Sequence, residues 1–433
     1  MTLRRALPAA LLIGVAGWLL VWFQTEPRAN FDSLIYHTHA LEYAGLDREE
    51  ADAVSWQIFA RYATERERTV VAETIGETWS TPADGRWMDL YQMRPLYPLL
   101  VAAAYPVVGE RAPMTVSAAV TIGFVMTTAL GFGLLFGWRA AGFASLAALL
   151  QVHFTQWLVF LATDGLAMTL WAATLLAVAF HARTGRWAWL AVIGLAVLAL
   201  GLTRPTSSLA PLVPAVCAGA AFVAREPVWR RFGVATAAAL VPAAAVVLAQ
   251  GLLGFPGVVD VLQEMPTRHF ALPDIEDPVG YTIRVLQWAV PQRLLPTLVE
   301  QPLLLATVAA GIAGLALNRS WTAAVFLSGL VVVPVAWVIH PVWFDGGRIL
   351  APAWVSLSLG VGLFAEWLLV ATRQPIGQAV DWATRPTTAP PVEIPVARPE
   401  TQPIPVRAPP ATGVAWHAAT ARHRLGKAPE VEA

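Results

Sequence analysis

Five ionisable side chains stand at or near the ends of long apolar runs in this sequence. They are Asp32, Arg94, Asp164, Arg204 and Arg348. A guanidinium fork matches the geometry of phosphate oxygens, and a carboxylate can take a proton from a hydroxyl group. Ionisable groups at membrane depth are costly and usually functional. The set therefore indicates a site that combines phosphate binding with proton abstraction.

Each of these residues also has a simpler interpretation that the sequence leaves open. Asp32 or Asp164 could cap a helix, where a carboxylate is favoured. Arg94 could be an interfacial arginine whose aliphatic stem packs on apolar surface. Arg204 and Arg348 could be ordinary turn residues.

Neighbouring polar residues extend the candidate site. If residues 30–44 form a helix, Asp32, Tyr36 and His39 share one face through their i, i+4, i+7 spacing. The candidate binding residues beyond the first five are Tyr36, His37, Tyr97, Arg268, His269 and Asp345. A short acidic stretch, 274–277, either binds Ca²⁺ or Mg²⁺ or is a solvated turn.

Composition places most of the chain in lipid. Of its 433 residues, 57% are hydrophobic and only 13% are charged, where soluble domains have roughly 25% charged residues. The mean hydropathy is +0.57. A net charge of zero makes nucleic acid an unsuitable partner. The single cysteine, Cys217, excludes a disulfide framework within the chain.

Ten apolar runs approach the length of roughly 20 residues that a membrane-spanning helix needs. They are 6–23, 113–136, 140–161, 165–182, 187–203, 206–224, 232–253, 303–317, 320–339 and 350–371. The run 95–108 is shorter and contains three prolines, so we expect an interfacial helix there that does not cross. The sequence predicts an all-α, polytopic integral membrane protein with about ten transmembrane helices.

Basic residues between the runs set the orientation. They are Arg139, Arg183, Arg186, Arg225, Arg230, Arg231, Arg319 and Arg373. All fall on one side if 95–108 does not cross, and the positive-inside rule makes that side cytoplasmic. Both termini are then cytoplasmic, and the five ionisable residues face outside.

The same orientation defines the remaining segments. Residues 24–94 form a first extracytoplasmic loop with helices at 30–44 and 48–66, the second capped by Asp47. Residues 254–302 form a second large extracytoplasmic loop. Residues 372–433 are rich in Pro, Ala, Thr and Val, which predicts a disordered cytoplasmic tail.

The order of these motifs over residues 6–371 resembles the GT-C superfamily of polyprenyl-phosphate-dependent glycosyltransferases, which includes protein O-mannosyltransferases and aminoarabinose transferases. Asp32 matches the acidic position of the first loop, and Asp164 matches the second acidic position. Arg94-Pro95-Leu96-Tyr97-Pro98 resembles the Arg/Lys-Pro-Leu-Tyr-Pro element of the family. Arg204 resembles a basic residue after the fifth span, and 347–352 resembles a late motif of Arg, apolar residues and Pro.

The resemblance implies an inverting sugar transfer from a polyprenyl-phosphate donor to a lipid, glycan or protein acceptor at the outer face of the membrane. The high proline and alanine content favours a bacterial plasma membrane. Asp32 would be the catalytic base or position the acceptor, and Asp164 would support the acceptor or a metal. Arg94, Arg204 and Arg348 would hold the lipid phosphate. Many relatives carry paired acids in the first loop, whereas Ser33 follows Asp32 here. We therefore assign no metal ligands, and a divalent cation, Mg²⁺ or Mn²⁺, stays open.

Two other functions stay open from the residues alone. A lipid or small-molecule transporter or flippase predicts charged residues near the middle of spans or at broken helices. Few Asp or Glu residues occupy such positions. An assembly scaffold that binds through the proline-rich tail predicts that Asp32 and the arginines are dispensable.

Overall fold

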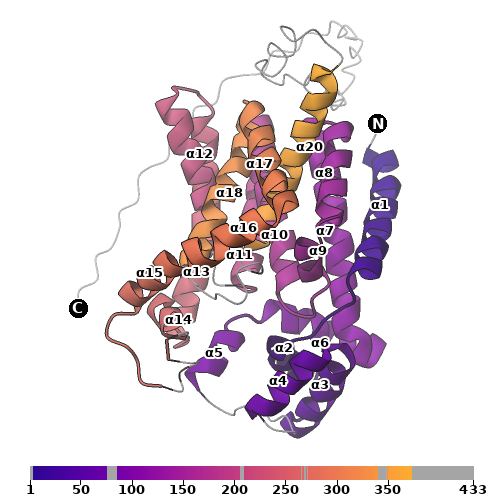
Figure 1. Ribbon diagram of the computed structural model, residues 1–433, viewed down its shortest axis with the longest axis vertical. Coiled ribbons are helices and arrows are strands. Elements are labelled where there is room, and N and C mark those ends of the chain that lie inside the picture. The colour runs from indigo at the N-terminus through magenta and orange to yellow at the C-terminus, as the bar shows by residue number, and fades with distance from the viewer. Residues whose placement is uncertain are drawn as a thin grey trace, which may run out of the picture. The chain divides into compact units, whose positions relative to one another are not determined.

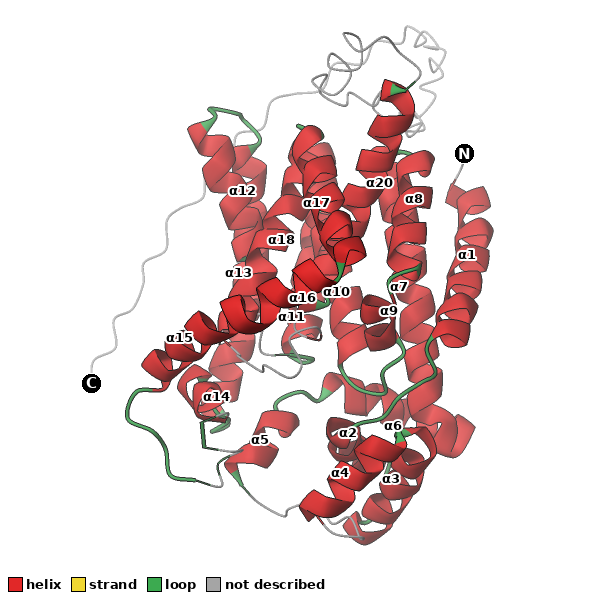
Figure 2. Cartoon of the chain, in the orientation of Figure 1, coloured by secondary structure: helices red, strands yellow, loops and turns green. Residues whose placement is uncertain are grey.

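The computed structural model describes residues 3–75, 85–204, 209–264, 266–267, 270, 272–339, 348 and 350–372. Every regular element in these ranges is a helix, which confirms the all-α prediction (Figure 2). Three candidate site residues, Arg268, His269 and Asp345, lie outside the described residues. So does the predicted disordered tail beyond residue 372.

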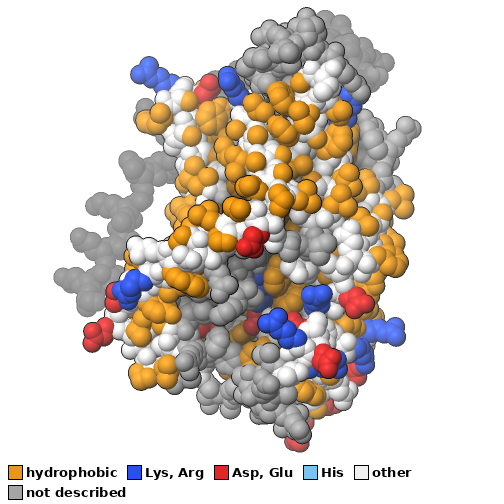
Figure 3. Space-filling view, viewed as in Figure 1, with side chains coloured by type: hydrophobic (Ala, Val, Ile, Leu, Met, Phe, Trp, Pro, Cys, Tyr) orange, Lys and Arg blue, Asp and Glu red, His pale blue; other side chains and the backbone are white. Residues whose placement is uncertain are grey.

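The apolar runs form a bundle of helices. Its members are α1 (Leu3–Gln24), α7 (Ala112–Phe136), α8 (Trp138–Leu149), α10 (Asp164–Thr184), α11 (Ala188–Gly201), α12 (Leu212–Val223), α13 (Trp229–Leu252), α17 (Pro302–Leu317), α18 (Trp321–Ile339) and α20 (Ala353–Ala371). Large apolar side chains such as Val241 and Leu248 point outward from this bundle. Apolar atoms cover most of its visible surface in Figure 3. Such a surface belongs in lipid, so the chain is a membrane protein.

The helices of the described chain vary more in length than the apolar runs of the sequence do. Four stretches are long and apolar enough to cross a bilayer: Leu96–Phe136, Asp164–Thr184, Trp229–Leu252 and Ala353–Ala371. Five apolar helices are shorter. The run 140–161 is divided into α8 and the short α9 (Val152–Leu158), because the chain leaves the helix at Gln151. The count of ten spans stays a prediction.

The described residues of the first polar segment, 24–75 and 85–94, lie at one end of the bundle (Figure 1). They contain α2 (Phe31–Tyr43), α3 (Arg48–Tyr62), α4 (Glu65–Ile75) and α5 (Arg86–Gln92). The predicted cap is confirmed, because the Asp47 carboxylate accepts the backbone N–H of Glu50 at 2.9 Å. α6 (Leu96–Val108) follows, packs against α2, and continues through the short turn Gly109–Arg111 into α7.

Residues 254–302, the second polar segment, also contain helices, which the sequence analysis did not assign. They are α14 (Val258–Glu264), α15 (Pro278–Ala289) and α16 (Leu295–Glu300), the last two joined by a π-helical turn, Val290–Leu294. A signal for α15 was present. Asp277 caps it by accepting the N–H of Gly280 at 2.7 Å, and Pro278 occupies the first helical position.

Glycines set the position of α20, which begins just after Arg348. Gly311 and Gly314 of α17 face Gly360 of α20, and the backbones of the two helices touch there. A Cβ atom on Gly360 would collide with the Gly311 carbonyl. Small residues let membrane helices approach this closely. α20 is thereby fixed between α17 and α8.

We expect Gly360→Leu to lower the free energy of unfolding by about 3 kcal/mol, because backbone atoms cannot yield to the new side chain. Gly219→Leu, on α12, is the matched control, since a Cβ at Gly219 meets no atom within 4 Å. Thermal unfolding of the purified protein in detergent measures both. Equal losses in the two variants would contradict the close crossing.

Candidate functional site

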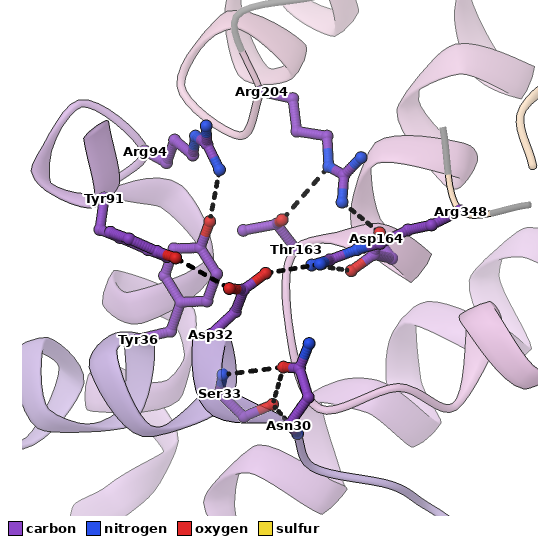
Figure 4. Close-up of polar contacts among 10 residues, drawn as sticks. All are labelled: Asn30, Asp32, Ser33, Tyr36, Tyr91, Arg94, Thr163, Asp164, Arg204 and Arg348. Carbon is purple, nitrogen blue, oxygen red and sulfur yellow. Dashed lines mark hydrogen bonds and ion pairs between the residues drawn. The ribbon is translucent and has the colours of Figure 1, made fainter. Parts of the chain in front are cut away.

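Arg348 joins the two candidate carboxylates (Figure 4). Its Nη1 donates to Oδ2 of Asp32 at 2.5 Å. Its Nε and Nη2 donate to the two oxygens of Asp164 at 2.7 and 2.8 Å, a bidentate pair. The side chains of Arg348 and Asp164 are 8% and 2% exposed, so this charge network is largely removed from water.

A second arginine, Arg204, also binds Asp164. Nη2 of Arg204 forms an ion pair with its Oδ1, and Nε of Arg204 donates to the Thr163 hydroxyl at 3.4 Å. Asp164 stands in the first turn of α10, where the helix dipole favours a negative charge. Its carboxylate nevertheless binds two arginines from distant parts of the chain, so a local capping role does not account for it.

Asp32 is not the cap of α2. Asn30 takes that role through a capping box with Ser33, in which each side chain bonds the backbone of the other. The Asp32 carboxylate is therefore available to other elements. Its Oδ1 accepts the Tyr91 hydroxyl at 2.8 Å, and its Oδ2 accepts from Arg348.

The surroundings of Asp32 keep it ionised. Burial raises the pKa of its carboxyl group, but Arg348, Tyr91 and Arg94 outweigh that effect and lower the pKa to about 2. A group with so low a pKa is a weak base. Asp32 can act as a base only when some of these donors leave it.

Arg94 is the cation that lacks a carboxylate. Its Nη1 donates to the Tyr36 hydroxyl at 3.1 Å, and its guanidinium lies 5.8 Å from the Tyr91 ring centroid. Within the described chain, no Asp or Glu forms an ion pair with it, and its Nε is buried without a hydrogen-bond partner. A buried donor of this kind is costly unless a ligand completes it. Glu264 acts on Arg94 through a longer-range charge interaction that raises the pKa of the guanidinium.

Aromatic rings surround the charged groups. The Arg348 guanidinium lies 5.8 Å from the Trp157 ring centroid and 5.6 Å from that of Phe160. Tyr36 contacts Tyr91 edge-on, with 5.4 Å between ring centroids. Aromatic faces attract guanidinium groups, so these rings help to fix the arginines.

A cavity of about 40 Å³ opens beside the network. Its polar lining is Asp164, Arg204 and Arg348, and its apolar lining includes Met168, Trp171 and Val332. The volume suffices for one or a few water molecules. A site with charged groups at one side and apolar walls at the other suits the charged head of an amphiphilic ligand.

Three other predicted residues, Tyr97, His37 and His39, take no part in the hydrogen bonds of the network. Tyr97 lies next to the network, because its ring centroid is 6.1 Å from that of Tyr36, and its buried hydroxyl has no hydrogen-bond partner among the described residues. His37 is buried beside Tyr97, with 6.4 Å between their ring centroids, in the packing of α2 on α6. Burial lowers the pKa of His37 to about 3, so its ring is neutral. His39 does not join Asp32 and Tyr36, because seven residues of helix advance it about 10 Å. It lies instead near Arg48 and Asp52.

The structure adds residues that the sequence analysis missed. Tyr91, Trp157, Phe160 and Thr163 contact the network, yet none carries a charge that would have singled it out. A tyrosine three residues before Arg94 and two aromatics shortly before Asp164 were the available signals. In the described residues, no group of three or more His, Cys, Asp or Glu gathers in a way that could hold a metal ion.

Comparison with known proteins adds no assignment: no protein-family model matches this chain, and no curated protein matches it significantly. The site therefore has to be interpreted from its own geometry.

Replacing Arg348 with Gln should weaken the pH dependence of stability that Asp32 contributes. In the wild type the pKa of about 2 lies below the ordinary 3.8, so stability is present above 3.8 and is lost as the pH falls through about 2. In the variant, burial, Tyr91 and Arg94 remain while the main cation is gone, so the pKa of Asp32 rises from about 2 and the stability that is lost on acidification becomes smaller.

Infrared titration of the carboxyl band and thermal unfolding in detergent measure these effects. At neutral pH we expect Arg348→Gln to cost about 3 kcal/mol of unfolding free energy, because two carboxylates lose a buried partner. Arg48→Gln, which breaks a partly exposed pair with Glu42 at 3.3 Å, is the control. If Arg348→Gln behaves like this control, Arg348 does not hold the network together.

Proposed function

We propose that this protein is a membrane glycosyltransferase that moves a sugar from a polyprenyl-phosphate donor to an acceptor on the extracytoplasmic face. The observation that carries the proposal is the buried Arg94 guanidinium, which has no carboxylate partner in the described chain and lies beside the ionised Asp32. An anion would bind the Arg94 guanidinium, and an acceptor hydroxyl would bind the Asp32 carboxylate.

The positive charges of Arg94, Arg204 and Arg348 suit a donor phosphate that is negatively charged when it leaves the sugar. Three guanidinium groups gather at the site, and a guanidinium group binds phosphate oxygens with two parallel donors. Arg94 would bind this phosphate first, since its binding requires no ion pair to be broken. Arg204 and Arg348 line the cavity and would bind the phosphate as negative charge develops on the leaving oxygen.

Asp32 would become a base when the donor binds. In the structure, Tyr91 and Arg348 occupy both of its oxygens. If the donor phosphate draws Arg348 away, the pKa of Asp32 rises and the carboxylate can accept the acceptor's hydroxyl proton. The acceptor oxygen then attacks the anomeric carbon, the bond from that carbon to the phosphate oxygen breaks, and the lipid phosphate leaves with the electron pair.

The donor set does not fit a divalent cation well. Asp32 and Asp164 are both bound to Arg348, and three guanidinium groups repel a second kind of cation at this position. The proposed transfer is therefore derived without a metal ion.

The proposed orientation has the site outside and both termini in the cytoplasm. α10 begins at Asp164 and ends near Arg183, so the two lie at opposite ends of the bundle. Arg183 donates to the Leu134 and Leu135 carbonyls, and Arg231 donates to the Ala182 carbonyl. This basic end fits a cytoplasmic surface. α6 lies beside α2 and α3 in Figure 1, which supports an interfacial helix that does not cross.

The motif order that resembles GT-C glycosyltransferases supports the same proposal. The residues matched to that family, Asp32, Arg94, Asp164, Arg204 and Arg348, come together although they are spread over more than 300 positions. A lipid, glycan or protein acceptor is proposed on the same resemblance, and the bacterial plasma membrane is proposed from the high proline and alanine content.

Sugar transfer by the purified protein from a panel of polyprenyl-phosphate sugars tests the function. We expect Asp32→Asn to lower turnover by about 100-fold or more, because the base is lost. We expect Arg94→Gln chiefly to raise the KM for the donor. Asp47→Asn is the matched control, since it removes a carboxylate from the same segment while asparagine still caps α3.

The outcomes separate the candidate functions. Transfer that survives Asp32→Asn unchanged would remove Asp32 as the base. Donor binding that depends on Arg94, with no transfer or donor hydrolysis under any condition, would instead support a lipid transporter or flippase.

Thiol labelling tests the orientation. A membrane-impermeant maleimide added to intact cells should modify Glu276→Cys, an exposed position in the second polar segment. It should modify the exposed Glu226→Cys only after permeabilisation. The native Cys217 is buried and gives little background. The reverse pattern would place the site in the cytoplasm.

A further inference from the structure

Arg86 binds two carboxylates of the second polar segment. Its Nε donates to Oδ1 of Asp260 at 2.9 Å, and its Nη2 pairs with the same oxygen. Its Nη1 donates to both oxygens of Asp274 at 2.8 and 2.7 Å. The guanidinium also lies 4.8 Å from the Phe270 ring centroid. These contacts join residues 174 and 188 positions apart.

The two carboxylates are held in place independently of Arg86. Oδ2 of Asp260 accepts the backbone N–H of Gly257 at 2.7 Å. The Gln263 side chain accepts the Ile275 N–H at 3.0 Å and donates to the Ile275 carbonyl at 2.8 Å. Asp274 is the immediate neighbour of Ile275, so this pair of bonds keeps it beside α14. The second polar segment thus presents a preformed acceptor for one arginine.

Arg86 is also the first residue of α5, and the far end of α5 reaches the candidate site. Tyr91 on α5 donates to Asp32, and Arg94 follows two residues after the helix. The Met93 carbonyl between them accepts the Gln250 side-chain amide at 3.2 Å, a second tie to the bundle. The position of α5 therefore decides where the Tyr91 hydroxyl and the Arg94 guanidinium lie.

We propose that Arg86, Asp260 and Asp274 form an electrostatic clasp that fastens the second polar segment to α5 and thereby positions Tyr91 and Arg94. The part of this proposal that concerns catalysis rests on the proposed transferase function. Arg86 is a positioning residue, because it contacts Asp260 and Asp274 and none of the residues of the Arg348 network.

The clasp differs from the Arg348 network in its exposure. The side chains of Arg86, Asp260 and Asp274 are 36%, 32% and 46% exposed. Ion pairs this open to water are weak and are screened by salt, whereas the Arg348 pairs are shielded. The clasp can therefore open and close while the Arg348 ion pairs stay formed, and opening would free α5, with Tyr91 and Arg94, to move.

Cysteine accessibility at position 88 reports on the clasp without any assay of activity. Met88 lies on α5 and is 2% exposed, so Met88→Cys should react slowly with a water-soluble maleimide while α5 is held. Adding Arg86→Ala should raise the labelling rate about three- to tenfold, because the two partly exposed pairs are lost. Raising the salt from about 0.01 to about 1 M should do the same to Met88→Cys alone, since the Debye length falls from about 30 to about 3 Å.

The matched control is Arg61→Ala in the Met88→Cys background. Arg61 pairs with Glu110 at 2.8 Å and is 51% exposed, but it belongs to α3 and has no contact with the clasp. We expect no change in labelling at position 88. The proposal is overturned if Arg86→Ala labels at the parent rate in low salt, or if Arg61→Ala accelerates labelling equally.

Transfer kinetics in the full chain separate the clasp from the proposed function. With the clasp and the transferase both correct, Arg86→Ala lowers kcat and removes most of the salt dependence of transfer, while Arg61→Ala does neither. Altered labelling with no transfer by the wild type would leave the clasp standing and reject the transferase. Transfer by the wild type with unaltered labelling would reject the clasp alone.

Discussion

The shared binding of Arg348 by Asp32 and Asp164 is the interaction on which the site depends. It joins residues that are 316 and 184 positions apart in the chain. Removing charges from water costs several kcal/mol for each ion, and only close, multiply bonded geometry repays it. α2, α10 and the start of α20 must therefore meet at one point, and any displacement of one leaves a buried charge without its partner.

The composition of the network explains how it can be stable and still bind a ligand. Asp164 is fully occupied by two arginines, while Asp32 shares its oxygens between Arg348 and a neutral tyrosine. Arg94 holds the remaining positive charge against Tyr36. An arriving anion can bind Arg94 directly and can compete with Asp32 for Arg348. The same arrangement that stabilises the empty site thus also couples anion binding to release of the Asp32 carboxylate.

The elements that carry the network are closely packed, whereas the ion pairs of the polar segments are open to water. Gly314 and Gly360 allow backbone contact between α17 and α20, which leaves little freedom for the element that follows Arg348. The capping box at Asn30 fixes the start of α2, which carries Asp32. Toward water, the contacts of Arg86 are partly exposed and screened by salt. In the absence of an anion, movement is therefore expected at the polar segments before the charge network.

The sequence by itself determined the features that depend on local pattern. Apolar runs placed the bundle helices, and the position of Asp47 gave the start of α3, because periodicity and capping act within a few residues. The candidates Asp32, Arg94, Asp164, Arg204 and Arg348 were found because charged residues stand out against apolar runs. Only the tertiary structure decided which of these residues pair. It also decided that Tyr91 donates a hydrogen bond to Asp32, that His39 lies near Arg48 and Asp52 instead, and that Arg86 binds Asp274. Those contacts join segments far apart in the chain, and their geometry follows from helix packing that no local pattern records.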